Sequence, residues 1–400
     1  MNNSNGRLTL QNNTSMLKVL IVFKQIGFCI ALPFLFTGLI TPLLAPSPIS
    51  VATAFRRAVI YAGPGDTFQQ TGFLNPGLEI RVVERNQTGI WVRIQRVDEA
   101  ENVVQDGWVI SAYLNRDTDL QFSTIPVNST LLDSQPSNVN SQSMAKLYQA
   151  PILPIISDEM IEIFNLGQSL GNQSHVITKV GDSLSASNQY LIPLANTRRE
   201  LGPYDYLAPA LDFYTRAGIT DSVAARIGLS TYAVFDPLWA DKEQCQPNES
   251  PLNCEYRLKK PAISFLMFGP NDVRSMTEDK YETQMRSLIE ATLAHGIIPV
   301  ISTFSAHPDE EFFWQSINFN LKLVALTEEY QTPLINLWAA ARILPDFGLD
   351  QDKVHLKVSG FDYLKYDTGH EAFYGVSLHN LLSICVLNQI YEKLNVEVNE

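Results

Sequence analysis

Three short polar motifs contain residue types that can take part in nucleophilic catalysis, and two of them directly follow apolar runs. A Gly-Asp-Ser turn ending in Ser183 comes after HVITKV, and a serine hydroxyl placed at a helix start can act as a nucleophile. Asn271, in a Gly-Pro-Asn-Asp turn after AISFLMF, can donate its amide to a developing oxyanion. His355 stands three residues after Asp352, so the carboxylate can orient the imidazole while its second nitrogen faces a nucleophile. These types predict a nucleophile, an oxyanion donor and a general base.

Each motif also has an ordinary structural explanation. A Ser or Asp at a helix start usually caps the helix, and Gly, Pro, Asn and Asp are the commonest turn formers. A second Asp-x-x-His pair, Asp367 and His370, has the same spacing as the first. We prefer His355 because it directly follows the last strand-and-loop region, whereas His370 lies nearer the final helix.

The elements needed to gather these motifs are predicted from Ala145 onward. Short apolar runs such as HVITKV, AISFLMF, GIIPVIS and TPLINLW alternate with longer stretches of helical pattern, such as 279–295 and 309–330. Repeated alternation of helix and buried strand predicts a parallel sheet with helices on both faces. In such sheets the chemistry collects at the carboxyl ends of the strands, which is where the motifs fall.

The order of the motifs resembles the SGNH (GDSL) hydrolase family over roughly residue 155 to the C-terminus. That resemblance implies an α/β fold, a flavodoxin-like three-layer α/β/α sandwich with a parallel sheet, for a hydrolase domain at 145–400. It also implies hydrolysis or transfer of esters without a cofactor. Carried over by motif, Ser183 would be the nucleophile, His355 the general base and Asp352 its orienting partner. Asn271 and the backbone amide of Ser183 would line the oxyanion hole.

The glycine that the family adds to its oxyanion hole has two candidates. It usually stands in a Gly-x-Ser/Thr turn after the second strand. Gly228, after the run DSVAARI, fits this setting best, and Gly218 is the runner-up. No Cys/His spacing in the chain suggests a metal site.

A separate all-β unit is predicted at 56–117. Short runs with strand alternation are separated by Gly, Pro and Asn turns, which is the pattern of a small barrel. The Gly63-Pro64-Gly65 turn, Trp91-Val92 and Gly107-Trp108-Val109 resemble a bacterial SH3-like domain. Such a domain would bind cell-wall peptide or polysaccharide, or act as a spacer. Residues 118–144 are rich in Ser, Asn, Gln and Pro and are predicted to be a flexible linker.

The first 54 residues read as a signal peptide or an N-terminal membrane anchor. Basic residues precede an uncharged run at 26–45, and Ala52-Thr53-Ala54 follows as a small-x-small cleavage pattern. The run is also close to the length that spans a bilayer, so cleavage after Ala54 and retention are both open. Either way the positive charges on its N-terminal side predict an extracytoplasmic location, secreted or anchored at the cell surface.

The cysteines agree with export. Cys245 and Cys254 bracket a turn-rich loop and could form a disulfide in an oxidising compartment. Cys385 lies in the apolar run LLSICVL and is predicted to be a buried core residue.

The composition and net charge of the chain limit the classes of function that it can have. Of the 400 residues, 45% are hydrophobic and 18% charged, which is typical of globular protein. The formal net charge of -13 argues against nucleic-acid binding, because phosphate contacts need clustered Lys and Arg. The prediction is an extracytoplasmic serine esterase acting on a small or carbohydrate-linked ester. The alternatives are a non-catalytic cell-wall-binding surface protein, or an acyltransferase or carbohydrate deacetylase on the same fold.

Overall fold

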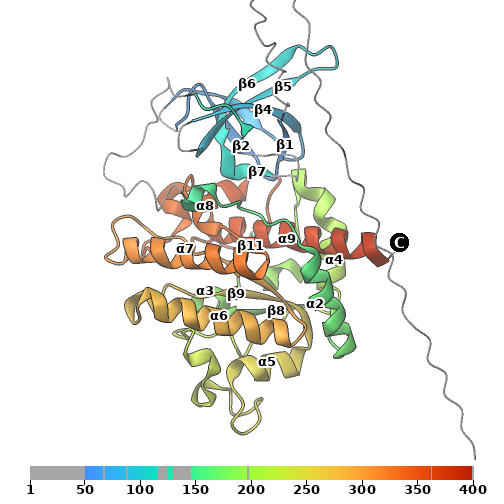
Figure 1. Ribbon diagram of the computed structural model, residues 1–400, viewed down its shortest axis with the longest axis vertical. Helices are drawn as coiled ribbons and strands as arrows, with labels where there is room; N and C mark the ends of the chain where they lie inside the picture. Colours follow the sequence, from blue (N-terminus) through green and yellow to red (C-terminus); the bar gives the residue numbers. More distant parts are fainter. Residues whose placement is uncertain are drawn as a thin grey trace, which may run out of the picture. The chain divides into compact units, whose positions relative to one another are not determined.

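The computed structural model describes most of the chain after the predicted leader (Figure 1). The described ranges are 50–65, 68–86, 89–115, 124–128, 146–195, 198–361 and 363–398. The first 49 residues of the predicted leader therefore lie outside them. Within the described ranges, no helix combines the length and apolar character needed to span a membrane.

A parallel sheet forms the centre of the C-terminal part, as predicted. Its hydrogen-bonded order is β11-β10-β9-β8, with every pairing parallel. The strands are β8 (Gln173–Gly181), β9 (Pro261–Met267), β10 (Ile298–Ser302) and β11 (Leu334–Ile335). All residues of β9 and β10 are buried, which suits strands covered on both faces. A parallel bridge between Gly181 and Ala225 extends the sheet beyond β8.

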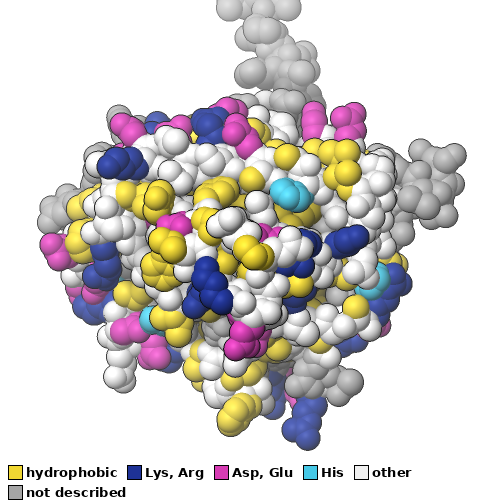
Figure 2. Space-filling model, turned by 90° about the horizontal axis from the view of Figure 1, so that it is seen from below, with side chains coloured by type: hydrophobic (Ala, Val, Ile, Leu, Met, Phe, Trp, Pro, Cys, Tyr) yellow, Lys and Arg dark blue, Asp and Glu magenta, His cyan; other side chains and the backbone are white. Residues whose placement is uncertain are grey.

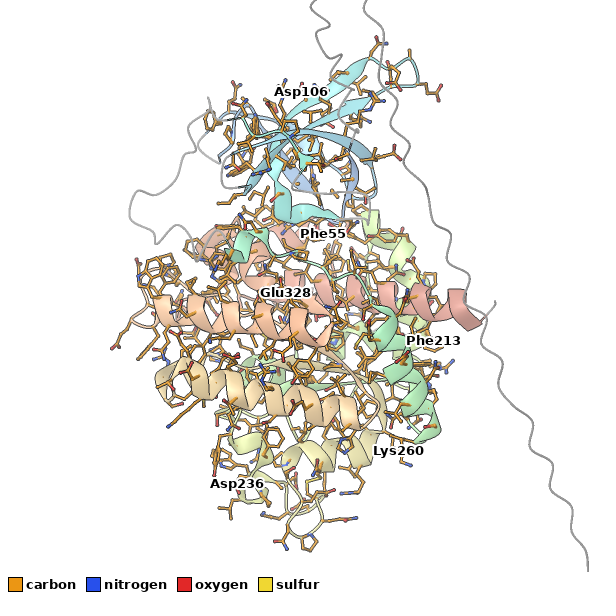
Figure 3. All side chains as sticks on the ribbon, viewed as in Figure 1. Phe55, Asp106, Phe213, Asp236, Lys260 and Glu328 are labelled. Atoms are coloured by element: carbon orange, nitrogen blue, oxygen red, sulfur yellow. A yellow bond between two sulfur atoms is a disulfide. The ribbon has the colours of Figure 1, made fainter. Side chains whose placement is uncertain are left out.

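Helices cover both faces of this sheet. On one face, the Tyr256 hydroxyl donates a hydrogen bond to Ser264 Oγ of β9 and forms a second hydrogen bond with Thr292 Oγ1. On the other face, His379 Nε2 lies 3.2 Å from Ser302 Oγ of β10. The first group consists of α5 (Pro251–Lys259), α6 (Glu278–Ala294) and α7 (Phe313–Tyr330), and the second of α4 (Ala208–Thr215) and α9 (Gly375–Val398). Side chains from both groups fill the space against the sheet (Figure 3).

Three further helices complete this part: α2 (Asp158–Ser169), α3 (Ser183–Ala186) and α8 (Leu337–Ala341). Their ends follow ordinary capping chemistry. Asn336 caps α8 by accepting a hydrogen bond from the Ala339 N–H, and Asp182 caps α3. Because α3 begins at the carboxyl end of β8, its first residues stand at the edge of the sheet where function is expected.

The N-terminal part is an antiparallel sheet of seven strands. Its order is β3-β2-β6-β5-β4-β1-β7. The strands are β1 (Ser50–Ala54), β2 (Ala58–Tyr61), β3 (Gln70–Leu74), β4 (Glu79–Arg85), β5 (Trp91–Val97), β6 (Val103–Ile110) and β7 (Leu114–Asn115). The prediction of short strands is confirmed. Within the described residues, no pairing joins β3 to β7, so the sheet is unclosed and the predicted SH3-like barrel is not shown.

Strand β1 corrects the predicted boundary at Arg56. It pairs with β4 and β7, and the side chains of Ala52 and Ala54 are buried beneath the sheet. Alternating small residues are what a signal peptidase reads, but they also suit a strand whose alternate residues pack closely. Cleavage after Ala54 would remove this strand, so the β unit begins no later than Ser50.

The predicted linker is also corrected at its start. Residues 124–128 lie along β4, where Val127 forms a bridge with Arg85 and Asn128 Nδ2 donates to Glu84 Oε2. The side chain of Ile125 is buried. These five residues therefore pack with the β unit, and the other residues of 118–144 lie outside the described part.

The β unit contacts the α/β part through a buried arginine. The Arg56 guanidinium donates to the carbonyl oxygens of Ala340 and Glu371, at 3.5 and 3.4 Å, and stacks over the Tyr113 ring. The Tyr113 hydroxyl also donates to the Ala340 oxygen. Because Arg56 has no exposed surface, the two parts meet in a shared buried layer.

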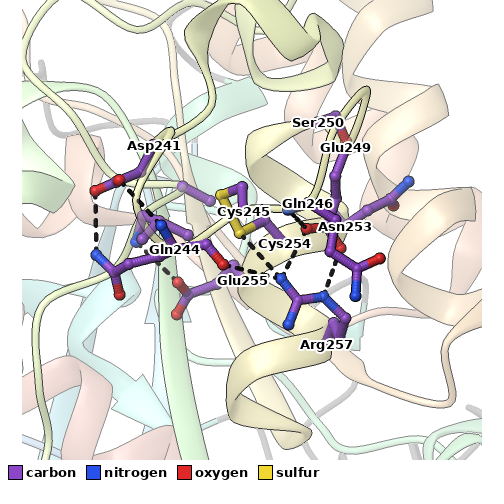
Figure 4. The surroundings of a disulfide bond; sticks show 12 residues. Asp241, Gln244, Cys245, Gln246, Glu249, Ser250, Asn253, Cys254, Glu255 and Arg257 are labelled. Carbon is purple, nitrogen blue, oxygen red and sulfur yellow. Dashed lines mark hydrogen bonds and ion pairs between the residues drawn. A yellow bond between two sulfur atoms is a disulfide. The ribbon is translucent and has the colours of Figure 1, made fainter.

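The predicted disulfide between Cys245 and Cys254 is confirmed (Figure 4). It joins the loop after η6 (Pro237–Trp239) to α5. The Glu249 carboxylate lies near the two sulfur atoms, but bonded sulfurs offer no thiolate ligand, and Glu249 pairs with Arg257 at 2.8 Å. Cys385 is buried, as predicted, and burial raises the pKa of its thiol to about 12.

Removing the disulfide is expected to destabilise the fold. The bond closes a short loop, with a sequence separation of 9, so replacing both cysteines with serine should lower the free energy of unfolding by about 2–3 kcal/mol. Urea unfolding of the oxidised wild type and the double variant measures this. Reductant should shift the wild type to the stability of the variant. An equal stability of the oxidised wild type and the variant would contradict the expectation.

Candidate active site

Ser183 is placed by a turn that only glycine fits. Gly181 ends β8, and a Cβ atom at this position would lie 2.1 Å from the Met267 oxygen and 2.3 Å from Ser185 Oγ. Asp182 then caps α3, because its Oδ1 accepts a hydrogen bond from the Leu184 N–H at 3.0 Å. Ser183 is therefore the first residue of a helix, beside backbone amides that have no partner within the helix.

A continuous hydrogen-bonded path joins Ser183 to His355 and Asp352. His355 Nε2 lies 2.9 Å from Ser183 Oγ, and His355 Nδ1 lies 2.6 Å from Asp352 Oδ2. The other carboxylate oxygen of Asp352 accepts hydrogen bonds from the N–H groups of Val354 and His355. Thus the serine, imidazole and carboxylate stand in the order that nucleophilic catalysis requires.

The local environment favours an ionised Asp352. Partial desolvation raises the pKa of this carboxyl group, but the hydrogen bonds from Val354 and His355 outweigh it, so the pKa lies below its ordinary value. The turn that carries the pair is closed by two backbone hydrogen bonds, from the Asp350 N–H to the His355 oxygen and from the Lys353 N–H to the Asp350 oxygen. These hydrogen bonds hold the turn in a shape in which the Nδ1 side of the His355 imidazole faces the Asp352 carboxylate.

Asn271 and Gly228 lie on two loops that are joined by hydrogen bonds. Asn271 follows β9, and its Nδ2 donates to the Leu229 oxygen at 3.4 Å. The next residue, Asp272, accepts hydrogen bonds from the N–H and hydroxyl of Thr231. At its other end this segment is hydrogen bonded to the turn before Ser183, because the Arg226 N–H donates to the Gly181 oxygen.

Of the two glycines that are candidates for the oxyanion hole, Gly228 is therefore the better placed. It stands between Arg226 and Leu229, and its N–H donates to no group in the described part of the chain. Gly218, in contrast, lies toward the amino edge of the sheet. The neighbouring Thr220 and Asp221 accept hydrogen bonds from Lys259, the last residue of α5, just before β9 begins. Lys260, labelled in Figure 3, marks this edge.

The competing histidine, His370, makes no hydrogen bond with Ser183. His370 begins the short helix η9 (His370–Ala372), and its ring lies 5.3 Å from the Tyr374 ring. The imidazole at Ser183 Oγ is that of His355. The structure thus brings Ser183, His355 and Asp352 together and leaves Asp367 and His370 in a different segment.

Two carboxyl groups beside the site are buried, although their sequence motifs predict only a turn or a helix cap. The side chains of Asp182 and Asp272 have no exposed surface. Desolvation raises the pKa of Asp182 to about 7 and that of Asp272 to about 6. In each, Oδ2 has no hydrogen-bond partner among the described residues. Their positions in the Gly-Asp-Ser and Asn-Asp motifs were the only sequence signal, and burial could not be read from it.

A buried lysine supports the segment that follows α3. Lys179 Nζ donates to the carbonyl oxygens of Ser187 and Tyr190, at 2.8 and 3.1 Å. Desolvation lowers the pKa of this ammonium group to about 8. Tyr190 itself is buried and stacks on His379, so it belongs to the core behind the site.

Asp182 should make the stability of the fold depend on pH. Its folded pKa, about 7, is above the ordinary 3.8, so its protonated form is favoured in the folded state. Its contribution is therefore most favourable below pH 4 and is lost as the pH rises through 7. Asp182→Asn keeps the capping oxygen and removes the charge. The variant should gain stability relative to wild type between pH 5 and 8, by about 2–4 kcal/mol.

Urea unfolding at several pH values measures this change. Asp236→Asn is the matched control, because Asp236 caps η6 in the same way but is only partly buried. Parallel pH profiles for wild type and Asp182→Asn would contradict the expected effect.

Charges of both signs are spread over the molecular surface on the side shown in Figure 2. Lys and Arg side chains there alternate with Asp, Glu and hydrophobic side chains, and they form no continuous basic area.

Comparisons with known proteins give structural similarities only. No family model matches the chain, and no curated protein matches it. One similar structure is a putative lipolytic protein of the G-D-S-L family from Desulfitobacterium hafniense DCB-2, with 12% identity, coverage of 53% of this chain and 99% of that chain, and a TM-score of 0.34. A second similar structure is Axe2, an acetylxylan esterase from Geobacillus stearothermophilus, with 18% sequence identity and a TM-score of 0.32. The match covers 49% of this chain and 93% of Axe2. A third similar structure, TesA, has 18% sequence identity and a TM-score of 0.34. The match covers 52% of this chain and 99% of TesA. Solved structures similar to this chain thus include a putative lipolytic protein of the G-D-S-L family and an acetylxylan esterase.

Proposed function

We propose that this protein is an extracytoplasmic serine esterase of the SGNH type that hydrolyses a small or carbohydrate-linked carboxylic ester. The observation that carries the proposal is the path from Asp352 through His355 to Ser183 Oγ, with distances of 2.6 and 2.9 Å. An isolated serine hydroxyl is a weak nucleophile. A base within hydrogen-bonding distance, itself oriented by a third group, is what activates it.

The reaction would proceed through an acyl-enzyme on Ser183. His355 Nε2 takes the hydroxyl proton as Oγ attacks the ester carbonyl carbon, and the charge that develops on the imidazole is stabilised by Asp352. The protonated imidazole then gives its proton to the departing alcohol oxygen. Water, deprotonated by the same nitrogen, attacks the acyl carbon and releases the acid, which restores the Ser183 hydroxyl.

The oxyanion would be held by the amides of Ser183 and Gly228 and by the side chain of Asn271. Each donor of this kind is typically worth about 2.7–4 kcal/mol of the activation barrier. The fixed loops favour this role, because the segment containing Gly228 is hydrogen bonded both to Gly181 and to Asn271. The donors would therefore need little reorganisation when charge develops.

An export setting is supported by the disulfide, since such bonds persist in oxidising compartments. The β unit retains the role proposed for an SH3-like domain, attachment to cell-wall peptide or polysaccharide. Its contacts through Arg56 also support a structural role.

Labelling with a fluorophosphonate probe tests the proposal directly. The folded wild type should form a covalent adduct at Ser183, and the Ser183→Ala variant should not. Absence of labelling in the folded wild type would overturn the esterase and favour a non-catalytic binding protein. Product analysis with an acetylated glycan, in water and with an added sugar acceptor, separates hydrolysis from acyl transfer.

A further inference from the structure

The segment that carries Gly228 is anchored at its start by backbone hydrogen bonds. The Arg226 N–H donates to the oxygen of Gly181, the last residue of β8, at 3.1 Å. The Leu229 N–H donates to the Arg226 oxygen at 3.1 Å, which closes a turn with Gly228 inside it. Gly228 has a φ of +78°, a left-handed conformation that favours glycine. This end of the segment therefore depends on no side-chain hydrogen bond to the turn before Ser183.

The other end of the same segment is anchored by a buried carboxyl group. Asp272 Oδ1 accepts two hydrogen bonds from Thr231, one from its N–H at 3.0 Å and one from its hydroxyl at 2.8 Å. Neither residue has any exposed surface. The hydroxyl also lies 3.7 Å from Met276 Sδ, but a thioether is a weak acceptor, so the carboxyl oxygen is the stronger partner. One oxygen of Asp272 thus receives both hydrogen bonds that Thr231 donates to it.

Asp272 also stands directly after Asn271, so it joins the loops of two proposed oxyanion donors. Asn271 Nδ2 donates to the Leu229 oxygen at 3.4 Å, and an amide nitrogen has a second hydrogen that can face an oxyanion. The Leu229 oxygen orients this amide only while its own segment stays in place. The hydrogen bonds from Thr231, two residues further along, hold it there. Loss of the Asp272 acceptor would therefore displace Gly228 and misdirect Asn271 together.

We propose that Asp272 is a positioning residue for the oxyanion hole. By accepting both hydrogen bonds from Thr231, it fixes the Gly228 amide and the Asn271 side chain relative to each other. The inference rests on the proposed esterase function. Donors that are fixed before the reaction need no reorganisation when charge develops on the substrate oxygen, which is why they lower the barrier. In this role Asp272 acts through the two loops and not on the reacting atoms.

This role requires an acceptor oxygen at position 272 rather than a negative charge. Both hydrogen bonds from Thr231 go to Oδ1 of Asp272, and Oδ2 has no hydrogen-bond partner among the described residues. An asparagine keeps a carbonyl oxygen that can take the place of Oδ1. Asp272→Asn should therefore keep the two loops together. Asp272→Ala should not, because alanine leaves the buried Thr231 N–H and hydroxyl without this acceptor.

Steady-state hydrolysis of p-nitrophenyl acetate tests the role. Thr231→Val keeps the size of the side chain but removes its hydroxyl, so kcat should fall roughly tenfold. Asp272→Ala removes the acceptor for both hydrogen bonds, so kcat should fall roughly 100-fold, as for the loss of an oxyanion donor. KM should change by less than about twofold in both, because these donors act mainly on the transition state. In Asp272→Asn, kcat should stay within about threefold of wild type.

Thr178→Val is the matched control. Thr178 is buried, and its hydroxyl also donates to a buried carboxyl group, that of Glu255. The substitution removes the same kind of hydrogen bond from within β8, before the turn that leads to Ser183. It should lower the free energy of unfolding in urea but leave kcat within about twofold of wild type.

A boronic acid inhibitor gives a second measurement that a loss of stability alone would not change. Its tetrahedral adduct with Ser183 mimics the transition state and places an oxygen in the oxyanion hole. In Thr231→Val, its Ki should rise by the same factor by which kcat/KM falls. In an Asn271→Ala background, Thr231→Val should lower kcat less than it does in wild type, since one of the donors that it positions is already absent.

The outcomes separate the inference from the function on which it rests. A wild type that hydrolyses no ester and is not labelled by fluorophosphonate overturns the esterase itself. With an active wild type, an unchanged kcat and boronic acid Ki in folded Thr231→Val overturn the positioning role alone. A loss in Asp272→Asn as large as that in Thr231→Val also overturns it. Should Asp272→Ala fail to fold, the comparison of Thr231→Val with Asp272→Asn still decides.

Discussion

Replacing Ser183 with alanine is expected to lower kcat for ester hydrolysis by about 10⁶-fold, to the residual rate that binding and the oxyanion donors can support. His355→Ala should cause a loss of similar size, because the serine hydroxyl then has no base at 2.9 Å to take its proton. Steady-state hydrolysis of a short aryl ester measures both effects. The two losses should not add in the double variant, since the residues act as one unit.

His370→Ala is the control for this prediction. Its segment has the same Asp-x-x-His spacing, but its ring contacts Tyr374 rather than Ser183. Activity should stay within about twofold of wild type, as for a substitution outside the reacting groups. Activity that survives in His355→Ala and disappears in His370→Ala would reverse the assignment of the base.

Asp352→Asn is expected to lower kcat by about 10⁴-fold without disturbing the fold. The carboxylate accepts a hydrogen bond from His355 Nδ1 at 2.6 Å, which leaves Nε2 free to accept the serine proton. An asparagine can instead donate its amide to Nδ1, which places the proton on Nε2, where it blocks proton transfer from Ser183. The defect lies in the tautomer of the imidazole, so KM should change little.

Asp367→Asn supplies the comparison for this variant. It makes the same change in the competing Asp-x-x-His pair, and kcat should remain within about twofold of wild type, since that pair is not bonded to Ser183. The rate of fluorophosphonate labelling should fall in parallel with kcat in Asp352→Asn, because both depend on the activated hydroxyl. Unchanged labelling in that variant would show that the carboxylate does not orient the base.

Much of the site was predictable because parallel strands bring their carboxyl ends to one edge. Ser183 follows β8 and Asn271 follows β9, its neighbour, so the apolar runs before them indicated that they would meet. The distinction between His355 and His370 rested on position along the chain. The hydrogen bond to Ser183 Oγ now adds a geometric reason.

Other features depend on packing that local patterns do not encode. Ala52 and Ala54 carry the small side chains of both a cleavage site and a tightly packed strand, and only their pairing with β4 distinguishes the two. The polar composition of residues 118–144 predicts a flexible linker, although the Ile125 side chain within this range is buried. Asp182 and Asp272 read as turn residues because burial of a carboxyl group depends on segments distant in sequence.

The contact of Arg56 and Tyr113 with the Ala340 carbonyl has a consequence for the way the chain can be divided. Arg342, two residues beyond Ala340, holds the loop that carries Ala306. A shortened protein that starts at residue 145 would lack Arg56 and Tyr113 and would leave the Ala340 carbonyl oxygen of α8 without the two hydrogen bonds that they donate. Such a truncated protein should be less stable and less soluble than the full chain, so we expect the part from residue 145 onward to depend on the β unit for its folding.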